Sequence, residues 1–313
     1  MLGFLARRVA ATIPVLLFVA VFVFAMLRLT PGDPAAVLAG DNATPRQIEE
    51  IRAELGLDEP VWTQFAIYAA RLLQGDLGVS YFFNRPVADL VAQRIEPTLS
   101  LALVTILVTV VVAVPLGTLA AYRHGSWLDR LVMGFSVAGF SIPVFVLGYL
   151  LIWIFAVELR WLPVQGFTSI REGLWPFLER MILPASALSV IYIALIARIA
   201  RASVLEVLGE DYVRTARAKG LAELAVVVRH ALRNAAVPIV TVIGVGIALL
   251  IGGVVVTESV FNIPGLGRLT VDAVLARDYP TIQAVILLFS VLYVLINLFI
   301  DLTYLVLDPR IRY

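Results

Sequence analysis

The residues that could carry out chemistry are few and scattered. The sequence has one lysine, Lys219, which stands between Ala218 and Gly220. A phosphate-binding P-loop needs Gly-Lys-Ser/Thr, because its lysine reaches the phosphates and its hydroxyl binds magnesium. Lys219 lacks this setting, so we expect no cofactor in this chain.

Other catalytic patterns are incomplete. Residues 139–143 place Ser141 two positions after a glycine, but the closing glycine of a nucleophile elbow is missing. The sequence has no cysteine, which excludes thiol nucleophiles and zinc–thiolate sites. His124 and His230 have no other ligands nearby in the sequence, so we expect no metal site. The sequence therefore predicts a non-catalytic protein.

The composition is that of an integral membrane protein. Of 313 residues, 61% are hydrophobic and 15% are charged, against about 45–50% and about 25% in soluble proteins. A membrane span needs about 20 mostly apolar residues. Six stretches without Asp, Glu, Lys or Arg meet this need in length or nearly so: residues 9–27, 99–122, 131–157, 182–197, 236–257 and 281–300. We therefore expect an all-α protein with six transmembrane helices.

The distribution of arginine predicts the orientation. With the N-terminus inside, the inner segments would be residues 1–8, 123–130, 198–235 and 308–313, with 13 Arg/Lys and 6 Asp/Glu. The longer outer segments would hold 11 Arg/Lys and 16 Asp/Glu. Basic residues favour the cytoplasmic side. Both termini are therefore expected inside.

The first outer segment is too long for a plain hairpin and carries helix signals. Thr44 and Gln47 have the spacing of a capping box, with Pro45 as the first helical residue and Gly56 as a terminator. A second helix is expected over residues 60–73 and a third over 86–94. The segment should form a small external helical unit.

The span interiors contain small residues and prolines. Small residues of this kind let helices approach closely, so we expect static packing, with a conformationally mobile pore as the alternative. Pro115 and Pro143 are expected to interrupt the second and third spans. Glu258 and Asp301 lie near span ends, where we expect boundary carboxylates that reach water. The small residues singled out are Gly117 with Ala121, Gly134 with Ala138, and Gly244, Gly246, Gly252 and Gly253.

One inner segment, residues 198–235, is far longer than the other inner connection. Residues 203–208 are expected to form a short helix. A second helix would begin at the acidic pair Glu210 and Asp211 and end at Gly220, with basic residues in its last turn. Such a helix suits docking, although a solvated loop is the alternative.

Several motifs together resemble one family. The run from Asp211 to Leu221 resembles the cytoplasmic EAA loop of type I ABC-importer permeases, in particular those of the dipeptide/oligopeptide/nickel family. Residues 27–34, 75–78, 230–234, 264–268 and 277–280 match the same family. The chain looks like the first of its two paired permeases. It departs from the broader consensus at Arg214, at Thr215 and at the late Pro238.

The resemblance implies a set of site residues and partners. ATP and Mg²⁺ would be bound by two partner ATPase subunits, and the pathway would be shared with a second homologous permease. An external solute-binding protein and the lipid bilayer complete the set, without nucleic acid, in the bacterial inner membrane. The implied ATPase-coupling residues are Glu210, Asp211, Tyr212, Arg214, Thr215, Ala216, Arg217, Ala218, Lys219, Gly220 and Leu221. Ala216 is expected to face the ATPase groove.

The expected organisation is an N-terminal tail with the first span (1–28), an external helical segment (29–96), the transmembrane domain with coupling loop 201–235 (97–308), and a tail (309–313). The expected solute is a di- or oligopeptide. Nickel chelates, glutathione, opines and oligosaccharides are alternatives, as is a stand-alone secondary transporter or a membrane scaffold.

Overall fold

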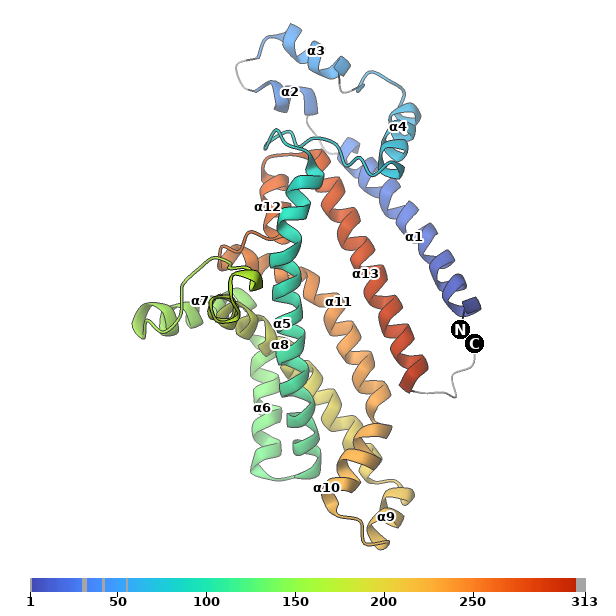
Figure 1. The fold of residues 1–313 in the computed structure, drawn as a ribbon, viewed down its shortest axis with the longest axis vertical. Helices are drawn as coiled ribbons and strands as arrows, with labels where there is room; N and C mark the ends of the chain where they lie inside the picture. Colours follow the sequence, from blue (N-terminus) through green and yellow to red (C-terminus); the bar gives the residue numbers. More distant parts are fainter. Residues whose placement is uncertain (1, 30–32, 41–42, 55, 308–313) are drawn as a thin grey trace. The chain divides into compact units, whose positions relative to one another are not determined.

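The computed structural model describes residues 2–29, 33–40, 43–54 and 56–307, which form helices joined by loops (Figure 1). In this part of the chain the only β pairing is one isolated bridge between Val79 and Pro86. The helices are α1 (Leu2–Leu29), α2 (Pro34–Ala39), α3 (Pro45–Glu54), α4 (Val61–Leu73), α5 (Val87–Tyr122), α6 (Trp127–Ser141), α7 (Val144–Leu151), η1 (Ile152–Glu158), η2 (Ile170–Glu172), α8 (Leu174–Leu208), α9 (Asp211–Ala218), α10 (Glu223–Ala225), η3 (Val226–Leu232), α11 (Ala236–Val260), α12 (Leu266–Leu275) and α13 (Tyr279–Leu307).

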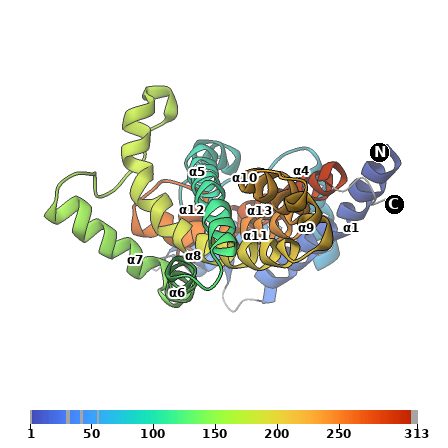
Figure 2. The same ribbon diagram turned by 90° about the horizontal axis from the view of Figure 1, so that it is seen from below.

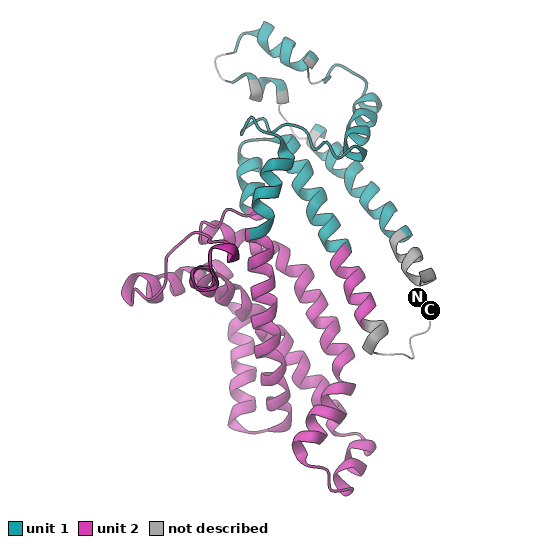
Figure 3. Ribbon diagram, viewed as in Figure 1, with its two compact units in different colours: residues 1–96, 268–294 teal, residues 97–267, 295–313 magenta. Residues whose placement is uncertain are grey.

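The chain divides into two compact units, coloured in Figure 3. One comprises residues 1–96 and 268–294, and the other residues 97–267 and 295–313. The second unit has α8 at its centre, packed against α6, α7 and α11. In α8, 61% of the most apolar stretch is buried, against 22% in α5 and 28% in α11. The core of this unit therefore lies along α8.

Among the residues that the structure describes, four helices are long and apolar enough to cross a membrane: α5, α8, α11 and α13. The predicted third span is not one straight helix, because α6 and the pair α7–η1 are bent by 103°. Pro143 has no N–H and forces Ile142 into an extended conformation (φ −94°, ψ 120°), so α6 stops at Ser141. The first predicted span lies in α1, whose described apolar stretch is Ala10–Met26.

We expected Pro115 to interrupt the second span, but it does not. Both Pro97 and Pro115 lie inside the continuous helix α5. The predicted helix 86–94 is the first part of α5 rather than a separate element, and residues 203–208 are likewise the last turns of α8. Proline costs one backbone hydrogen bond, and helices in membrane proteins tolerate this when neighbours compensate.

The predicted local signals of the first unit are confirmed. The Thr44 N–H donates to Gln47 Oε1 at 2.9 Å, and the Gln47 N–H donates to Thr44 Oγ1 at 3.4 Å, so the capping box opens α3. Gly56 and Gly75 follow α3 and α4 with φ of +63° and +76°. The short helix α2 was not predicted, although Asp33 caps it by accepting from the Ala35 N–H at 3.0 Å.

The small residues differ in what they pack against. A Cβ on Gly117 would lie 2.4 Å from the Ala197 carbonyl oxygen, so this glycine allows α5 to approach α8. Gly253 and Gly244 would also meet side chains, whereas Gly134 and Gly252 have no heavy atom within 4 Å. The Gly134–Ala138 pair is therefore not a packing contact within this chain.

Candidate functional site

The helix α9 stands in the long connection that follows α8. The Glu210 carbonyl accepts from the N–H groups of Val213 and Arg214 at 3.0 and 3.2 Å, which starts the helix. Asp211 places an acid in the first turn, where it favours the helix dipole. At the other end Gly220 has φ +76°, and its N–H donates to the Arg217 carbonyl at 2.9 Å. The predicted helix between Glu210 and Gly220 is confirmed.

One face of α9 is anchored to its own chain. Val213 is fully buried and Ala216 is 7% exposed. They pack with Val226, and the half-buried side chains of Val207 and Leu208 at the end of α8 complete this cluster. α9 and α10 lie side by side in both Figure 1 and Figure 2. The helix is therefore held against α8 and η3 by a small apolar cluster.

The inward position of Ala216 corrects one expectation. We expected Ala216 to face a partner groove, but its side chain points into the cluster of Val213 and Val226. A large side chain there would disrupt the packing of α9 itself. The helical period explains the placement, because residues three apart, such as 213 and 216, share one face.

The other predicted residues form the outward face of α9 and its flanks. All are exposed: Glu210, Asp211, Tyr212, Arg214, Thr215, Arg217, Ala218, Lys219, Gly220 and Leu221. Arg217 Nη2 contacts Glu223 Oε1 at 2.8 Å, and this hydrogen bond raises the pKa of Arg217. The exposed pair Arg214–Asp211 at 3.5 Å adds little stability. This face combines charges with the apolar surfaces of Tyr212 and Leu221.

A second polar site lies in the same unit, where α11 ends. Glu258 is fully buried, so the expectation of a boundary carboxylate in water was wrong. Thr98 Oγ1 donates to Glu258 Oε1 at 2.6 Å and accepts from the Leu266 N–H at 2.8 Å. One hydroxyl thus joins α5, α11 and the start of α12. Asp301 is half-buried within α13, which continues beyond it.

The glycines after α11 make room for this carboxylate. A Cβ on Gly265 would lie 2.1 Å from Glu258 Oε1, and one on Gly267 would lie 2.9 Å from Oε2. The two glycines of the 264–268 motif are therefore needed for close approach. Sequence reasoning missed this site, because nothing local to residue 258 indicates that Thr98, 160 positions away, would meet it.

A buried aspartate organises the first unit in a similar way. Asp278 is fully buried and accepts from Ser80 Oγ, from the Tyr81 N–H at 3.0 Å and from Thr281 Oγ1 at 2.7 Å. In the same place a Cβ on Gly78 would meet Pro280 Cβ at 3.6 Å. The motifs 75–78 and 277–280, far apart in sequence, are therefore neighbours.

The histidines have separate surroundings. His124 Nδ1 lies 3.1 Å from Asp129 Oδ2, and Arg201 forms a two-point contact with the same carboxylate. The His230 carbonyl accepts from Asn234 Nδ2. Within the described ranges no group of three metal-ligating side chains is found.

Comparison with known proteins gives consistent matches along the chain. Residues 113–313 match the family described as binding-protein-dependent transport system inner membrane component, and residues 1–102 match the N-terminal part of such a component. The sequence is 55% identical over 310 residues to a probable peptide ABC transporter permease of Sinorhizobium fredii, covering 99% of both chains. It is 47% identical over 313 residues to a glutathione transport system permease of Escherichia coli K12, covering 100% of both.

Among solved structures, an inward-facing form of the MetNI methionine ABC transporter has a similar fold. The TM-score is 0.58 at 20% identity, with 70% of this chain and 96% of that chain covered. This likeness concerns the fold alone. The sequence matches decide the family: the chain belongs to the binding-protein-dependent transport system inner membrane components, and it is a multi-pass protein of the bacterial inner membrane.

Proposed function

We propose that this chain is a permease subunit of an ATP-driven importer and forms half of the translocation path for small peptides. The observation that carries this proposal is the form of α9: it is anchored on one face by Val213 and Ala216 and exposed on the other. A partner that moved α9 would move the end of α8, the most buried of the long apolar helices. Full-length similarity to a probable peptide ABC transporter permease supports the choice of solute.

The proposed complex contains a second homologous permease, two ATPase subunits and an external solute-binding protein. The ATPase subunits bind ATP and Mg²⁺, and this chain catalyses no reaction. Closing of the ATPase pair would be passed through Glu210–Leu221 to the spans, which shifts the population of outward-facing states. In this proposal the exposed coupling residues between Glu210 and Leu221 contact the ATPase subunit. Ala216 instead anchors α9 to its own chain.

The proposed topology has six spans with both termini in the cytoplasm, where the bent pair α6–η1 counts as one span and α1 as the first. The organisation into residues 1–28, 29–96, 97–308 and 309–313 goes with it. This topology places α9 on the ATPase side and α2–α4 outside. The excess of arginine and lysine in the predicted inner segments supports it.

Glutathione is the second candidate solute, because a relative that is 47% identical is named a glutathione permease. The test is uptake by the complete complex in proteoliposomes, with labelled dialanine and labelled glutathione measured separately. We expect ATP-dependent accumulation of the dipeptide, with no ATP hydrolysis by this chain alone. Accumulation of glutathione without dipeptide would reassign the solute, and hydrolysis by the isolated chain would contradict its non-catalytic role.

A further inference from the structure

The turn that joins α5 to α6, residues 123–130, carries more positive than negative charge (Figure 1, lower end of α6). It contains Arg123, Arg130 and a single acid, Asp129. Arg201 of α8 makes a two-point contact with the Asp129 carboxylate, and its Nη2 lies 2.8 Å from Oδ2. In the described part of the chain neither Arg123 nor Arg130 is paired with an acid. The turn therefore presents at least two uncompensated positive charges.

The same aspartate holds the turn in a fixed shape. The Gly125 N–H donates to Asp129 Oδ2 at 3.0 Å, and Gly125 has φ +79°. The Asp129 N–H donates to Ser126 Oγ at 3.4 Å, so that Ser126 caps the start of α6. The Asp129 side chain itself is buried. A ligand at this turn would therefore meet preorganised arginines rather than the acid, and less order would be lost on binding.

Large apolar side chains lie exposed beside these arginines. On α6, Trp127 is 70% exposed and Leu131 is 61% exposed. Because Trp127, Arg130 and Leu131 are three and four positions apart, they share one face of the helix. Leu119 and Tyr122, in the last turn of α5, are exposed as well. Positive charge is thus joined directly to apolar surface, and tryptophan is the residue typical of the level at which lipid headgroups lie.

The exposed face of α6 continues beyond Leu131 without packing on this chain. Gly134 and Ala138 follow at helical spacing and are exposed, and a Cβ on Gly134 would have no heavy atom within 4 Å. The buried side of α6 points toward α8, where a Cβ on Gly139 would lie 3.1 Å from Ala194 Cβ. There is consequently open space below the arginines, alongside the large apolar side chains.

We propose that this surface, formed by Arg123, Trp127, Arg130 and Leu131 and called here the α6 basic edge, binds an anionic phospholipid. The phosphate contacts the two guanidinium groups, and an acyl chain lies along Leu131 and Gly134. A free phosphate ion offers the same anion but leaves the exposed apolar side chains uncovered, so we commit to the lipid. The proposal requires only that the chain lies in a membrane, and it stands or fails independently of the transport function.

The test uses the full-length chain in detergent, with phosphatidylglycerol and phosphatidylcholine of identical acyl chains as probes. Native mass spectrometry measures the fraction of the chain that retains each lipid during a titration. Because each basic residue near an anionic headgroup strengthens binding, we expect phosphatidylglycerol to bind at least about tenfold more tightly than phosphatidylcholine. Equal retention of the two lipids, or retention of neither, would overturn the proposal.

Matched arginine variants locate the surface. Arg123→Gln and Arg130→Gln should each weaken phosphatidylglycerol binding about fivefold and leave phosphatidylcholine binding unchanged. Arg130→Lys keeps the charge and should retain most of the preference. Arg171→Gln is the control, because Arg171 is an exposed arginine of the same unit with Glu172 beside it, and it should change neither lipid. An unchanged preference for phosphatidylglycerol in both Arg123→Gln and Arg130→Gln would contradict the assignment.

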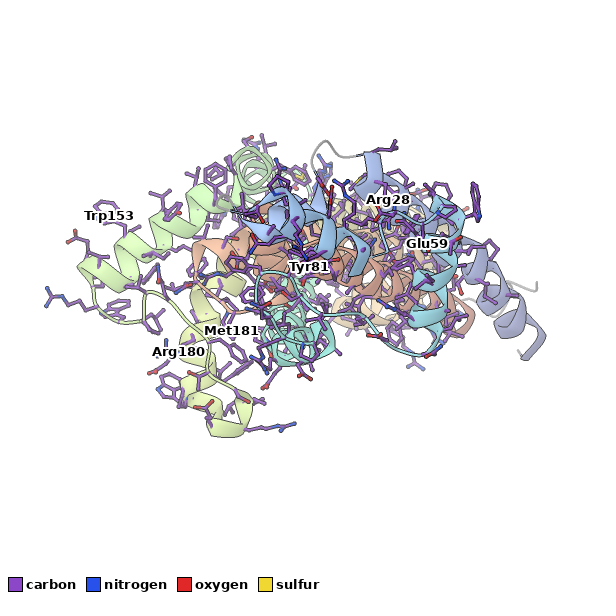
Figure 4. The ribbon with its side chains drawn as sticks, turned by 90° about the horizontal axis from the view of Figure 1, so that it is seen from above. Arg28, Glu59, Tyr81, Trp153, Arg180 and Met181 are labelled. Atoms are coloured by element: carbon purple, nitrogen blue, oxygen red, sulfur yellow. The ribbon has the colours of Figure 1, made fainter. Side chains whose placement is uncertain are left out.

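A pair of tryptophan variants tests the apolar part of the surface. Trp127→Leu should weaken phosphatidylglycerol binding several-fold, because the indole lies on the same face as Arg130. Trp153 of η1, labelled in Figure 4, is also exposed but has no arginine within four residues on either side. Trp153→Leu should therefore leave the preference for phosphatidylglycerol intact. Equal losses in the two variants would show that any exposed tryptophan acts in this way and would contradict the proposed surface.

Two further arms exclude other occupants. Thermal unfolding of the lipid-free chain is measured with phosphatidylglycerol and with inorganic phosphate, and equal stabilisation by both would assign the surface to a soluble anion. Co-purification with the partner subunits is measured for the Arg123→Gln, Arg130→Gln double variant. Reduced co-purification with unchanged lipid retention would make the α6 basic edge a protein interface, and the proposal would be wrong. Reduced retention of phosphatidylglycerol with normal co-purification would support it.

Discussion

The hydroxyl of Thr98 is a small group that connects three helices. It donates to the buried carboxylate of Glu258 and accepts from the Leu266 N–H. In an interior of low polarity, a buried polar group that loses a hydrogen bond cannot replace it with water, so the loss is costly. The end of α11 and the start of α12 are therefore sensitive to a single methyl-for-hydroxyl exchange on α5.

Replacing Thr98 by valine should destabilise the chain by about 1–3 kcal/mol, because a buried carboxylate and a buried N–H each lose a partner. The matched control is Thr105→Val on the same helix, since the buried Thr105 hydroxyl has no hydrogen-bond partner within the described chain. Thermal unfolding of the detergent-purified chain, followed by circular dichroism, measures both. Equal melting temperatures for the two variants would show that the Thr98 bridge contributes nothing.

Two glycine substitutions should have opposite effects. An added Cβ at Gly265 would lie 2.1 Å from Glu258 Oε1, so Gly265→Ala requires the loop or the carboxylate to shift, at a cost of about 1–3 kcal/mol. Gly252 lies in α11 with no heavy atom within 4 Å of an added Cβ. Gly252→Ala should therefore stabilise the helix by up to about 1 kcal/mol. Thermal unfolding of the two variants tests this prediction. A lower melting temperature for Gly252→Ala than for Gly265→Ala would contradict the claim that Gly265 is crowded and Gly252 is not.

At the scale of elements, α9 has one face anchored to its own chain and an exposed face for which we propose docking. Ala218→Trp changes only the exposed surface, so we expect an unchanged melting temperature of the isolated chain but weaker co-purification with the ATPase subunits. Ala216→Trp should destabilise the isolated chain by about 1–3 kcal/mol, because Ala216 is packed in the cluster with Val213. Ala202→Trp, an exposed position on α8, is the control and should change neither quantity. Full ATPase binding by Ala218→Trp would mean that this end of α9 is not in the interface.

Elements whose signals are local could be predicted from the sequence. The capping box at Thr44 and the terminating glycines Gly56, Gly75 and Gly220 act within a few residues, so their helix ends were placed correctly. Pro143 was a reliable break for the same reason. Pro115 was not, because a proline in a long apolar helix is tolerated when neighbouring helices support it.

Sites that depend on distant partners could not be predicted in this way. The residues next to Glu258 in the sequence do not indicate that its side chain is buried. Its burial depends on Thr98 and on the glycines of the 264–268 motif, which meet it only in the folded structure. The facing direction of Ala216 depended in the same way on Val226, which lies outside α9. The helix that carries the proposed coupling residues was predicted from the sequence, and the division of these residues into two faces required the structure.

At the scale of the whole molecule, topology can be tested without removing native thiols, because the sequence has no cysteine. Ala53→Cys on α3 and Ala218→Cys at the end of α9 both lie at exposed positions. A membrane-impermeant maleimide should label Ala53→Cys in intact spheroplasts, and Ala218→Cys only after permeabilisation. Both variants should be labelled fully once the membrane is dissolved. The reverse pattern would place α9 outside and exclude the proposed orientation.

Lys219 gives the molecule an unusual chemical property. It is the single lysine of the sequence, and it caps the C-terminal end of α9 on the exposed side. Apart from the N-terminal amine, a primary-amine reagent therefore has one target in the whole chain. A cross-linker attached there would identify the proteins that lie next to α9. A fluorophore attached there would report how distances from α9 change during a transport cycle, without any engineered residue.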